Sequence, residues 1–475
     1  MLKKTVYMHE LMLISTMILH DFPVCVILSL EIPRKAGTCM ERKLTALLKA
    51  WKESKYRKPL VLQGARQVGK TYAVMQFGKQ EYDNVAYFNF QTSVSLAETF
   101  AENLTPSYLI PILSHISGQT ITKGRTLIVF DEVQLCERAL TSLKYFCEEA
   151  PEYHIIAAGS LLGVAVNREK YAFPVGKVDR VTMYPMDMEE FLIALNEQSL
   201  VDRIHQCYDE NVPMPTALHE AAIKRYRQYL AIGGMPEAVA RYIDTEDYLQ
   251  VHHVLETIQM DYLDDMSKYQ KDANEIKKTR LTFGTVAVQL SKKNVRFQYK
   301  LIKKGARAAE YENAIGWLAS AGLILRLYRA EQIMKPLENY RNIDDFKIYL
   351  SDTGLLCAQK DLRAEDVLYM ENELADFKGG MTENYVATQL ISAGFKPYFW
   401  RNEKGTNEVD FILNLEGKLI PVEVKSGENV SAASLREYDR LFHPAWSIRI
   451  SEKNFGFENN IKSVPLYATF CIQPK

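Results

Sequence analysis

Short hydrophobic runs alternate with stretches of helical spacing from Pro59 onward. This alternation is the order of a parallel β-sheet whose strands are connected by crossover helices. Residues 224–248 also have helical spacing, but Gly233 and Gly234 interrupt them. We therefore expect an α/β unit followed by a group of helices. Strands are predicted at residues 60–63, 85–90, 126–132 and 153–160, and a short extended piece followed by a helix is predicted within 181–195.

The second half of the chain predicts two further units. Tyr311, Ile315 and Leu318 recur at helical spacing, Gly322 ends that helix, and LILRLY followed by FKIYL predicts two strands. After them, TENYVATQLISAG predicts a helix, and EVDFIL and LIPVEVKSG predict two more strands. No repeat, low-complexity segment or Pro/Ser-rich linker separates the units. The expected organisation is an extension at 1–39, an α/β core at 40–200, a helical lid at 201–270, a third unit at 271–370 and a C-terminal α/β unit at 371–475.

A glycine-rich motif lies between the first predicted strand and the helix after it. Residues 64–71 read GARQVGKT, which matches the pattern GxxxxGK[ST] of nucleotide-binding loops. The glycines of such a loop allow a tight backbone path whose N–H groups surround phosphates, and the following helix N-terminus favours negative charge. A chance glycine turn is the alternative. The motif predicts an ATP site formed by Gly64, Ala65, Arg66, Gln67, Val68, Gly69, Lys70 and Thr71, in which Lys70 reaches the β- and γ-phosphates and Thr71 holds Mg²⁺.

A second motif argues against a chance match. Residues 127–130 (LIVF) form a hydrophobic strand that ends in Asp131 and Glu132. Asp131 is predicted to bind Mg²⁺ through water, and Glu132 is predicted to polarise the attacking water as a general base. An exposed Asp-Glu pair is the alternative, and the hydrophobic residues directly before the pair argue against it. Ser160, which follows the strand IIAAG, is predicted to sense the γ-phosphate.

With these three features in this order, the segment resembles an AAA-type ATPase. GARQVGKT, FDEVQ, AAGSLLG, the stretch from FPVGKV to MYPMDMEEFL, and YLAIGGMPEAV are together similar to a group of bacterial and archaeal ATPases, over about residues 40–475. The family commonly has Gly-Arg where this chain has Gly176 and Lys177, a position associated with phosphate contact, and Lys lacks the bidentate fork of Arg. Arg66, Arg168 and Arg180 are the candidates for an arginine finger.

Basic residues accumulate between Ile276 and Arg307. Helices followed by the two predicted strands indicate a winged helix-turn-helix, which places one helix in a DNA major groove, and the resembling ATPases carry such a module here. A solvated basic face that only balances an acidic neighbour is the alternative. DNA is the predicted partner, through phosphate contacts that give affinity without sequence choice. The ten basic residues, which no Asp or Glu interrupts, are Lys277, Lys278, Arg280, Lys292, Lys293, Arg296, Lys300, Lys303, Lys304 and Arg307.

The C-terminal unit carries a second set of candidate residues. Asp410 lies on one predicted strand, Glu423 and Lys425 lie on the next, and Glu383 lies on the helix before them. Side chains alternate along a strand, so Glu423 and Lys425 share one face beside Asp410 on the hairpin partner. The two carboxylates can bind Mg²⁺, Glu383 can complete the metal shell, and Lys425 can orient water or stabilise charge at phosphorus. Glu408, on the same strand face as Asp410, is an alternative ligand.

This Asp…Glu-x-Lys arrangement is that of the PD-(D/E)XK nucleases. The end of the chain also resembles a domain of unknown function that is usually fused to these ATPases and is related to that superfamily. The resemblance implies a restriction-endonuclease-like α/β domain. It does not by itself imply cleavage, because a fold does not establish a function.

Composition sets limits and adds little chemistry. The 475 residues are 47% hydrophobic and 25% charged, which is typical of soluble globular proteins, and a net charge of −1 indicates no particular partner. Seven scattered cysteines without a CxxC pair argue against a disulfide framework or a zinc site and fit the reducing cytosol.

The start of the chain needs its own interpretation. Residues 11–30 are hydrophobic, but His20, Asp21 and Pro23 interrupt them and leave no stretch long enough to cross a bilayer. We interpret residues 1–39 as an extension before a start at Met40, with a weak signal peptide as the alternative. A cytoplasmic protein without stable membrane insertion is expected, and an oligomer is compatible with the sequence.

The predicted function is ATP hydrolysis with Mg²⁺, coupled to DNA binding and, as a further step, to DNA cleavage. The alternative is an ATP-switched regulator that binds DNA or protein and whose nuclease-like domain is catalytically inactive. Mg²⁺-dependent nicking of DNA separates the two.

Overall fold

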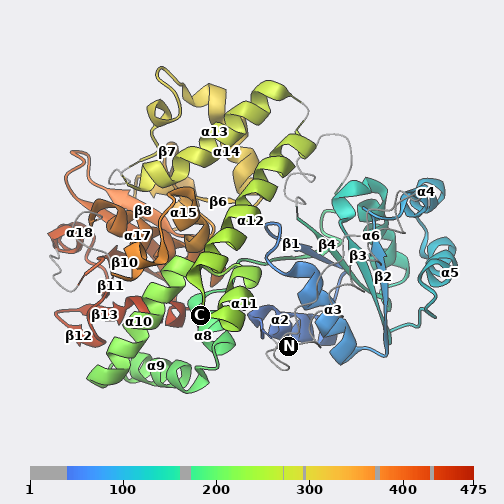
Figure 1. Ribbon diagram of the computed structural model, residues 1–475, viewed down its shortest axis with the longest axis horizontal. Helices are drawn as coiled ribbons and strands as arrows, with labels where there is room; N and C mark the ends of the chain where they lie inside the picture. Colours follow the sequence, from blue (N-terminus) through green and yellow to red (C-terminus); the bar gives the residue numbers. More distant parts are fainter. Residues whose placement is uncertain are drawn as a thin grey trace, which may run out of the picture. The chain divides into compact units, whose positions relative to one another are not determined.

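The computed structural model describes residues 40–160, 173–270, 272–291, 296–369, 375–427 and 433–474. All of them belong to one unit, which spans Cys39–Lys475. Two β-sheets organise these residues, one with five strands and one with eight, and the chain between the two sheets is largely helical (Figure 1).

The first sheet is parallel, with the strand order β2-β3-β4-β1-β5. All four predicted strands of this sheet are confirmed to within one or two residues. The strands are β1 (Leu60–Gln63), β2 (Asn84–Asn89), β3 (Thr126–Asp131), β4 (His154–Gly159) and β5 (Asp179–Thr182); the helices are α2 (Lys43–Glu53), α3 (Lys70–Glu81), α4 (Val94–Glu102), α5 (Pro106–Ser117) and α6 (Glu137–Glu149), with the 3-10 turn η1 (Val133–Leu135).

Alternate residues of the central strands enter two different hydrophobic cores. Leu62 and Val129 pack with residues of α2 and α3, whereas Val61, Ile128 and Phe130 pack with residues of α4, α5 and α6. Because successive side chains of a strand point to opposite faces, a strand covered on both faces reads as a continuous hydrophobic run. This explains why the sheet could be predicted from short hydrophobic runs.

A series of helices follows this sheet. The break predicted at Gly233-Gly234 is confirmed, since α10 ends and α11 begins there. A Cβ at Gly234 would lie 2.0 Å from the Met186 carbonyl oxygen, so this close backbone approach requires glycine. The helices are α8 (Met188–Ala194), α9 (Gln198–Glu210), α10 (Thr216–Ile232), α11 (Pro236–Thr245), α12 (Tyr248–Tyr269), α13 (Ala273–Leu290) and α14 (Ala308–Ser320), with the 3-10 turn η2 (Tyr299–Leu301).

The second sheet is mixed, with the order β12-β13-β11-β10-β9-β8-β6-β7. Its strands are β6 (Ile324–Ala330), β7 (Arg341–Leu350), β8 (Tyr398–Arg401), β9 (Glu408–Leu415), β10 (Lys418–Val424), β11 (Ser447–Ser451), β12 (Gly456–Glu458) and β13 (Ile461–Pro465). The remaining elements are the 3-10 turns η3 (Leu337–Tyr340) and η5 (Leu466–Cys471) and the helices α15 (Thr353–Gln359), α16 (Ala364–Leu368), α17 (Ala375–Ser392) and α18 (Ala433–Phe442).

The two strands predicted after α14 are confirmed as the antiparallel pair β6 and β7. They do not stand alone as a wing, because β6 pairs with β8 and extends the C-terminal sheet. The second half of β7 is buried at every position, as expected for a strand inside a packed sheet. The winged helix, the restriction-endonuclease-like fold and the domain boundaries stay predictions.

Among the described helices, none is long and apolar enough to cross a membrane.

Candidate functional site

The glycine-rich motif of residues 64–71, called the P-loop below, connects β1 to α3 and depends on two glycines. Gly64 and Gly69 have φ angles of 151° and 92°, values that favour glycine. A Cβ at Gly64 would also lie 2.2 Å from the Met183 carbonyl oxygen, so the loop has no room for a side chain there. Lys70 and Thr71 are the first residues of α3, which directs the helix N-terminus at the loop.

Lys70 lies over the loop. Its Nζ donates to the Gly64 and Ala65 carbonyl oxygens at 3.0 and 2.7 Å, and the residue is only 7% exposed. Burial lowers the pKa of Lys70 to about 8, although the nearby Glu132 and Asp131 raise it. A buried ammonium whose hydrogen bonds go to two carbonyl oxygens is a good partner for a phosphate.

Thr71 and Asp131 meet at the end of β3. The Thr71 hydroxyl donates to Asp131 Oδ2 at 2.9 Å, and the Tyr87 hydroxyl donates to the same oxygen at 2.7 Å. Burial, with the hydrogen bond to Asp131, raises the pKa of Tyr87 to about 12. Hydroxyl and carboxylate oxygens are the hard donors that Mg²⁺ takes in nucleotide sites, so these two residues fit the predicted metal. Tyr87 is a contact that the sequence interpretation missed.

Glu132 and Ser160 lie near this pair. Glu132 directly follows β3, has a φ angle of 52°, and accepts a hydrogen bond from the Gln134 amide. Ser160 is buried at the end of β4, which lies between β1 and β3 in the sheet. The sheet order therefore places Ser160 between the P-loop and Asp131. All the predicted residues of the nucleotide site thus lie at the carboxyl edge of one sheet.

Helix α12 holds the outer side of the P-loop. The Arg66 guanidinium pairs with Asp265 at 2.6 Å, and the Gln67 amide donates to Asp261 at 2.7 Å. Between them, the Tyr262 hydroxyl donates to the Arg66 carbonyl oxygen at 2.9 Å. Arg66, an arginine-finger candidate, is thus already engaged within its own chain. The acidic spacing of DYLDD on α12 was the available signal for these missed contacts.

Arg42 holds the inner side of the loop. Its Nη1 donates to the Val68 carbonyl oxygen at 3.0 Å, and its Nε pairs with Glu190 of α8 at 3.0 Å. Glu190 also takes part in the capping box that begins α8 with Asp187. The same helix end reaches the C-terminal unit, because the Met188 N–H donates to Gln389 of α17 at 2.9 Å.

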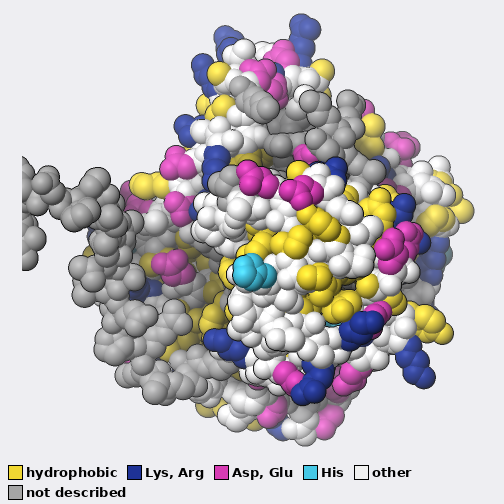
Figure 2. All heavy atoms as spheres, turned by 90° about the vertical axis from the view of Figure 1, so that its right-hand side faces the viewer, with side chains coloured by type: hydrophobic (Ala, Val, Ile, Leu, Met, Phe, Trp, Pro, Cys, Tyr) yellow, Lys and Arg dark blue, Asp and Glu magenta, His cyan; other side chains and the backbone are white. Residues whose placement is uncertain are grey.

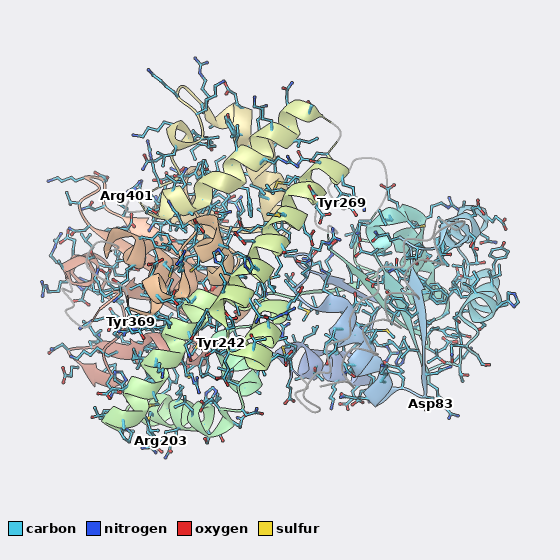
Figure 3. All side chains as sticks on the ribbon, in the orientation of Figure 1. Asp83, Arg203, Tyr242, Tyr269, Tyr369 and Arg401 are labelled. Atoms are coloured by element: carbon cyan, nitrogen blue, oxygen red, sulfur yellow. The ribbon has the colours of Figure 1, made fainter. Side chains whose placement is uncertain are left out.

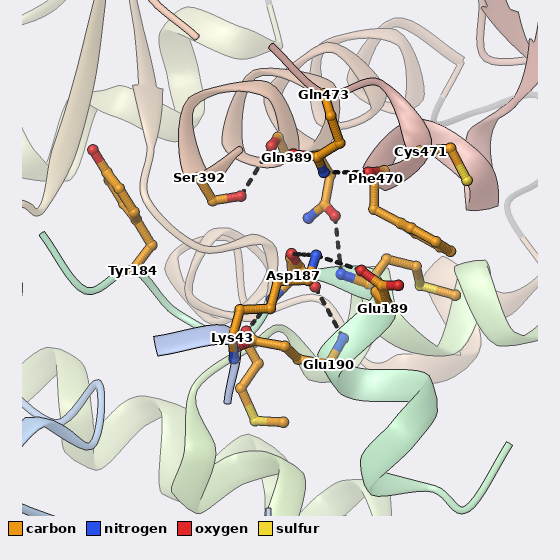
Figure 4. Close-up of polar contacts among 12 residues, drawn as sticks. Lys43, Tyr184, Asp187, Glu189, Glu190, Gln389, Ser392, Phe470, Cys471 and Gln473 are labelled. Atoms are coloured by element: carbon orange, nitrogen blue, oxygen red, sulfur yellow. Dashed lines mark hydrogen bonds and ion pairs between the residues drawn. The ribbon is translucent and has the colours of Figure 1, made fainter. Parts of the chain in front are cut away.

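A group of ionic contacts surrounds this junction. Figure 4 shows Lys43 beside Asp187 and Glu189, with Gln389 reaching the start of α8. Both carboxylates raise the pKa of Lys43, which outweighs the effect of burial. A chain of direct contacts therefore runs from the P-loop through Arg42 and α8 to α17.

The expected role of Lys177 is not supported by its position. Parallel pairing aligns Leu60, at the start of β1, with Asp179, so Lys177 lies at the edge of the sheet opposite the P-loop. There it pairs with Glu148 at 2.8 Å. Arg180 lies over the Phe173 ring at 3.9 Å, and Arg168 lies outside the described residues. Lys177 is therefore not a phosphate contact of its own chain's nucleotide site.

A buried lysine lies at the centre of the C-terminal carboxylates. Lys347 of β7 is fully buried, and its Nζ pairs with Glu383 at 2.7 Å and with Glu408 at 2.5 Å. These carboxylates and Asp410 raise the pKa of Lys347 well above its usual range against the effect of burial. The Tyr349 hydroxyl also donates to Glu383, at 2.6 Å. The sequence interpretation missed Lys347 and Tyr349, although a lysine inside the hydrophobic strand FKIYL was a signal.

Asp410, Glu423 and Lys425 lie together as predicted. The register of β9 and β10 pairs Phe411 with Val422, so Asp410 lies across from Glu423. Asp410 Oδ2 accepts the Val424 N–H at 2.7 Å, and Lys425 pairs with Glu423. Burial, followed by the charges of Glu423 and Glu383, raises the pKa of Asp410 well above its usual range, and burial also raises the pKa of Glu423.

The fit of a metal ion to these carboxylates is partial. Glu423 Oε2 is buried and has no hydrogen-bond partner within the described part of the chain, which leaves one carboxylate oxygen available to a cation. Glu383 is held by Lys347, however, and Glu383, Asp410 and Glu423 do not bring three oxygens within 4.8 Å of one another. Among the described residues, the one group of three that does so is His252, Glu256 and Asp361.

The basic stretch divides into two parts. Lys278 pairs with Glu275 at 2.7 Å, and Arg280 approaches Asp264 at 4.0 Å. Residues 292–295, which include Lys292 and Lys293, lie outside the described part of the chain. The five basic residues that follow are exposed and form no ion pair with another described residue: Arg296, Lys300, Lys303, Lys304 and Arg307. On the face that includes α4 and α5, by contrast, basic side chains are interspersed with acidic and hydrophobic ones (Figure 2).

Comparison with known proteins identifies the nucleotide-binding segment. Residues 56–192 match a family model described as an AAA domain. Residues 223–366 and 378–469 match two models described as domains of unknown function, DUF8612 and DUF4143. No curated protein matches the chain. The chain therefore contains a P-loop domain of the AAA ATPase type, as the motifs predict.

Several solved structures are similar to this chain at low identity. The Walker-type ATPase PABY2304 of Pyrococcus abyssi is 14% identical, with 68% of this chain and 96% of that one covered and a TM-score of 0.43. The ORC2 protein of Aeropyrum pernix is 12% identical, with 66% and 88% covered and a TM-score of 0.31. The RuvB Holliday junction branch migration motor of Thermotoga maritima is 16% identical, with 60% and 87% covered and a TM-score of 0.28.

Proposed function

We propose that this chain hydrolyses ATP with Mg²⁺ and that the ATP-bound state governs its binding to DNA. The observation that carries the first part is the hydrogen bond between Thr71 and Asp131, with Glu132 directly after Asp131. It unites the P-loop motif and the acidic end of β3 in one site, which neither motif could establish alone.

Each residue has a defined role in this reaction. Lys70 exchanges the Gly64 and Ala65 carbonyl oxygens for the β- and γ-phosphates of ATP. Thr71 and Asp131 hold Mg²⁺, which when bound neutralises charge on the phosphates. Glu132 accepts a proton from the water that attacks the γ-phosphate. The Gln134 amide donates a hydrogen bond to Glu132 and so orients its carboxylate. The Ser160 hydroxyl donates a hydrogen bond to the γ-phosphate and so distinguishes ATP from ADP.

DNA binding is proposed for the segment from Arg296 to Arg307. Its exposed basic residues have no acidic partner among the described residues, which argues against a basic face that only balances an acidic neighbour. Charges of this kind attract phosphates and release counterions, so affinity should fall with salt by about 0.9 log units per log unit for each phosphate contact.

A single experiment tests both parts. ATP turnover and duplex DNA affinity are measured over a range of salt concentrations, with and without Mg²⁺, ATP and DNA. Wild type should turn over ATP only with Mg²⁺ and should bind DNA with an affinity that depends on nucleotide. Changing Lys303, Lys304 and Arg307 to Glu should weaken DNA binding and flatten its salt dependence.

The control keeps the charge change and moves it elsewhere. Lys55, Lys224 and Lys396 are exposed and lie outside the basic stretch, so changing these three to Glu should leave DNA binding intact. Equal losses in the two triple variants would reject the proposed DNA segment. ATP turnover without Mg²⁺ would reject the proposed nucleotide chemistry.

A second candidate activity, metal-dependent cleavage of DNA, is favoured by the unpartnered Glu423 Oε2 beside Asp410. In this proposal Asp410 and Glu423 hold the cation and Lys425 stabilises charge at phosphorus, while Glu383 remains paired with Lys347. Plasmid nicking is compared for wild type, Asp410→Ala and Lys425→Ala, with Mg²⁺ or Mn²⁺. Nicking that both variants lose while retaining ATP turnover supports cleavage. Intact plasmid with wild type under every condition supports the alternative function, a regulator with an inactive domain.

A further inference from the structure

A pocket of about 620 Å³ lies between residues 296–300 and the turn that connects β8 to β9. This volume is within the range of pockets that hold small organic ligands. The residues that line the pocket belong neither to the nucleotide site nor to the carboxylate cluster of Glu383, Glu408, Asp410 and Glu423. Its two sides come from parts of the chain that are far apart in sequence, so only the folded protein forms it.

The charge of the pocket favours an anionic ligand. Arg296 and Lys300 line one side, Lys404 lines the other, and all three are exposed without an ion pair to another described residue. Glu403 is the one acidic residue among those that line the pocket. Arg401 also borders it but is already paired with Asp345, so its charge is largely compensated. The pocket lining therefore has three basic side chains without an ion pair to a described residue and one acidic side chain, so its net charge is positive.

Aromatic rings form part of the same wall. Phe297 and Tyr299 both line the pocket, with their ring centroids 4.9 Å apart and nearly perpendicular. Phe297 is fixed from behind, because its N–H donates to the Phe346 carbonyl oxygen at 2.7 Å and its ring stacks on that of Phe346. Gln298 is held by two hydrogen bonds with Gln289, each 3.0 Å long. These contacts within the protein hold the aromatic wall in place without a ligand.

We propose that this pocket binds an unpaired nucleotide of a single-stranded nucleic acid. The base stacks against Tyr299, and the flanking phosphates contact Arg296, Lys300 and Lys404. Positive charge combined with an aromatic surface is how proteins bind single strands without sequence preference. A duplex keeps its bases stacked inside the helix and leaves the aromatic wall unused. This inference rests on the proposed DNA binding and adds the strandedness of the ligand.

The position of the pocket relates it to the C-terminal carboxylates. Arg401, labelled in Figure 3, is the last residue of β8. In the strand register it lies opposite Glu408, the first residue of β9. The turn between them borders the pocket, and Asp410 follows two residues further along β9. One hairpin therefore connects the pocket to the carboxylate cluster.

The test measures fluorescence anisotropy with three labelled probes: a short oligo-dT strand, an abasic strand of the same length, and a duplex. Tyr299→Ala should weaken binding of oligo-dT by about 5- to 100-fold, which is the usual contribution of one stacked base. Binding of the abasic strand and the duplex should not change. Tyr299→Phe should retain full affinity. Tyr56→Ala, at an exposed tyrosine in another part of the chain, is the matched control and should bind all probes normally.

A second variant guards against loss of folding. Lys404→Glu lies in an exposed turn and should weaken oligo-dT binding without changing thermal unfolding. Unchanged oligo-dT binding in both Tyr299→Ala and Lys404→Glu would overturn the inference, as would equal losses on the oligo-dT and abasic strands. If wild type binds no probe at all, the proposed DNA function fails. If it binds all three equally well, only the pocket assignment fails.

Discussion

Arg42 and Glu190 form a buried ion pair, 3.0 Å from Nε to Oε1, and the same guanidinium donates to the Val68 carbonyl oxygen of the P-loop. A third contact, from Nη2 to the Tyr184 carbonyl oxygen at 2.8 Å, uses the planar fork that only arginine has. The P-loop and α8 are therefore held by one side chain from the segment that precedes α2.

Arg42→Lys should disturb the nucleotide site. Lysine keeps the charge but has one nitrogen in place of the three that contact Glu190, Val68 and Tyr184, so we expect a loss of about 1–3 kcal/mol in stability and a higher KM for ATP. Urea unfolding and steady-state turnover measure the two effects. Arg57→Lys is the matched control, because Arg57 donates to the Lys52 and Pro151 carbonyl oxygens, away from the P-loop. Equal KM values in Arg42→Lys and wild type would show that the loop does not depend on Arg42.

Lys70 and Glu132 should separate ATP binding from ATP hydrolysis. Lys70→Ala removes the ammonium that faces the phosphates and should abolish nucleotide binding. Glu132→Gln removes only the base, so ATP should still bind while turnover falls by about 100-fold or more. Isothermal titration with ATP and a phosphate-release assay distinguish the two variants. Wild-type turnover in Glu132→Gln would mean that another group accepts the proton.

Lys347 should be essential for stability whatever the C-terminal domain does. Lys347→Met leaves Glu383 and Glu408 buried without their cation, which should cost about 3–5 kcal/mol. Adding Glu383→Gln and Glu408→Gln to this variant removes the unpaired charges and should recover part of the loss. Lys418→Met, at an exposed lysine of β10, should change stability by no more than about 0.5 kcal/mol. The urea midpoints of wild type and the variants measure these differences in stability. Equal midpoints for Lys347→Met and Lys418→Met would refute a structural role for Lys347.

His154 should make stability depend on pH. Burial, with the positive charges of Arg57 and Lys52, lowers the pKa of His154 to about 4, and its Nδ1 is 2.7 Å from the Tyr82 hydroxyl oxygen. Between pH 6.5 and 4 the unfolded chain takes up a proton on this histidine that the folded chain does not, so stability falls as the pH falls. The contribution between pH 7 and pH 5 is about 1–2 kcal/mol. Urea unfolding of wild type and His154→Gln at both pH values measures it, and the difference between the two proteins should shrink at pH 5.

Contiguous motifs were the part of the site that the sequence could predict. Gly64 to Thr71 and Asp131 with Glu132 are each adjacent in the chain and follow strands that read as hydrophobic runs. The edge of a parallel sheet then brings them together, whatever the rest of the protein does. For the same reason, the hairpin register placed Asp410 opposite Glu423.

Contacts between distant segments could not be predicted in this way. The acidic DYLDD of α12 and the lysine within FKIYL mark Asp265 and Lys347 as unusual positions. Neither signal identifies the distant partner, which is Arg66 for Asp265 and Glu383 for Lys347. For Lys177, by contrast, the sequence suggested a contact that the structure does not support, because the corresponding family position is associated with phosphate. Only the register of β5 against β1 places Lys177 at the far edge of the sheet.

The pairing of β6 with β8 has a consequence for how the protein is made. All strands of the first sheet come from residues 60–182, so that sheet can be completed while the ribosome is still adding the rest of the chain. In the second sheet, β6 and β7 are synthesised before β8 and can pair with each other, but the second neighbour of β6 is β8, which is synthesised only after α17. Until then one edge of β6 has unpaired backbone groups, which is where strands of different chains associate. The nascent chain is therefore exposed to misassembly at this edge between the synthesis of β7 and that of β8, and a chaperone bound during this interval would protect it.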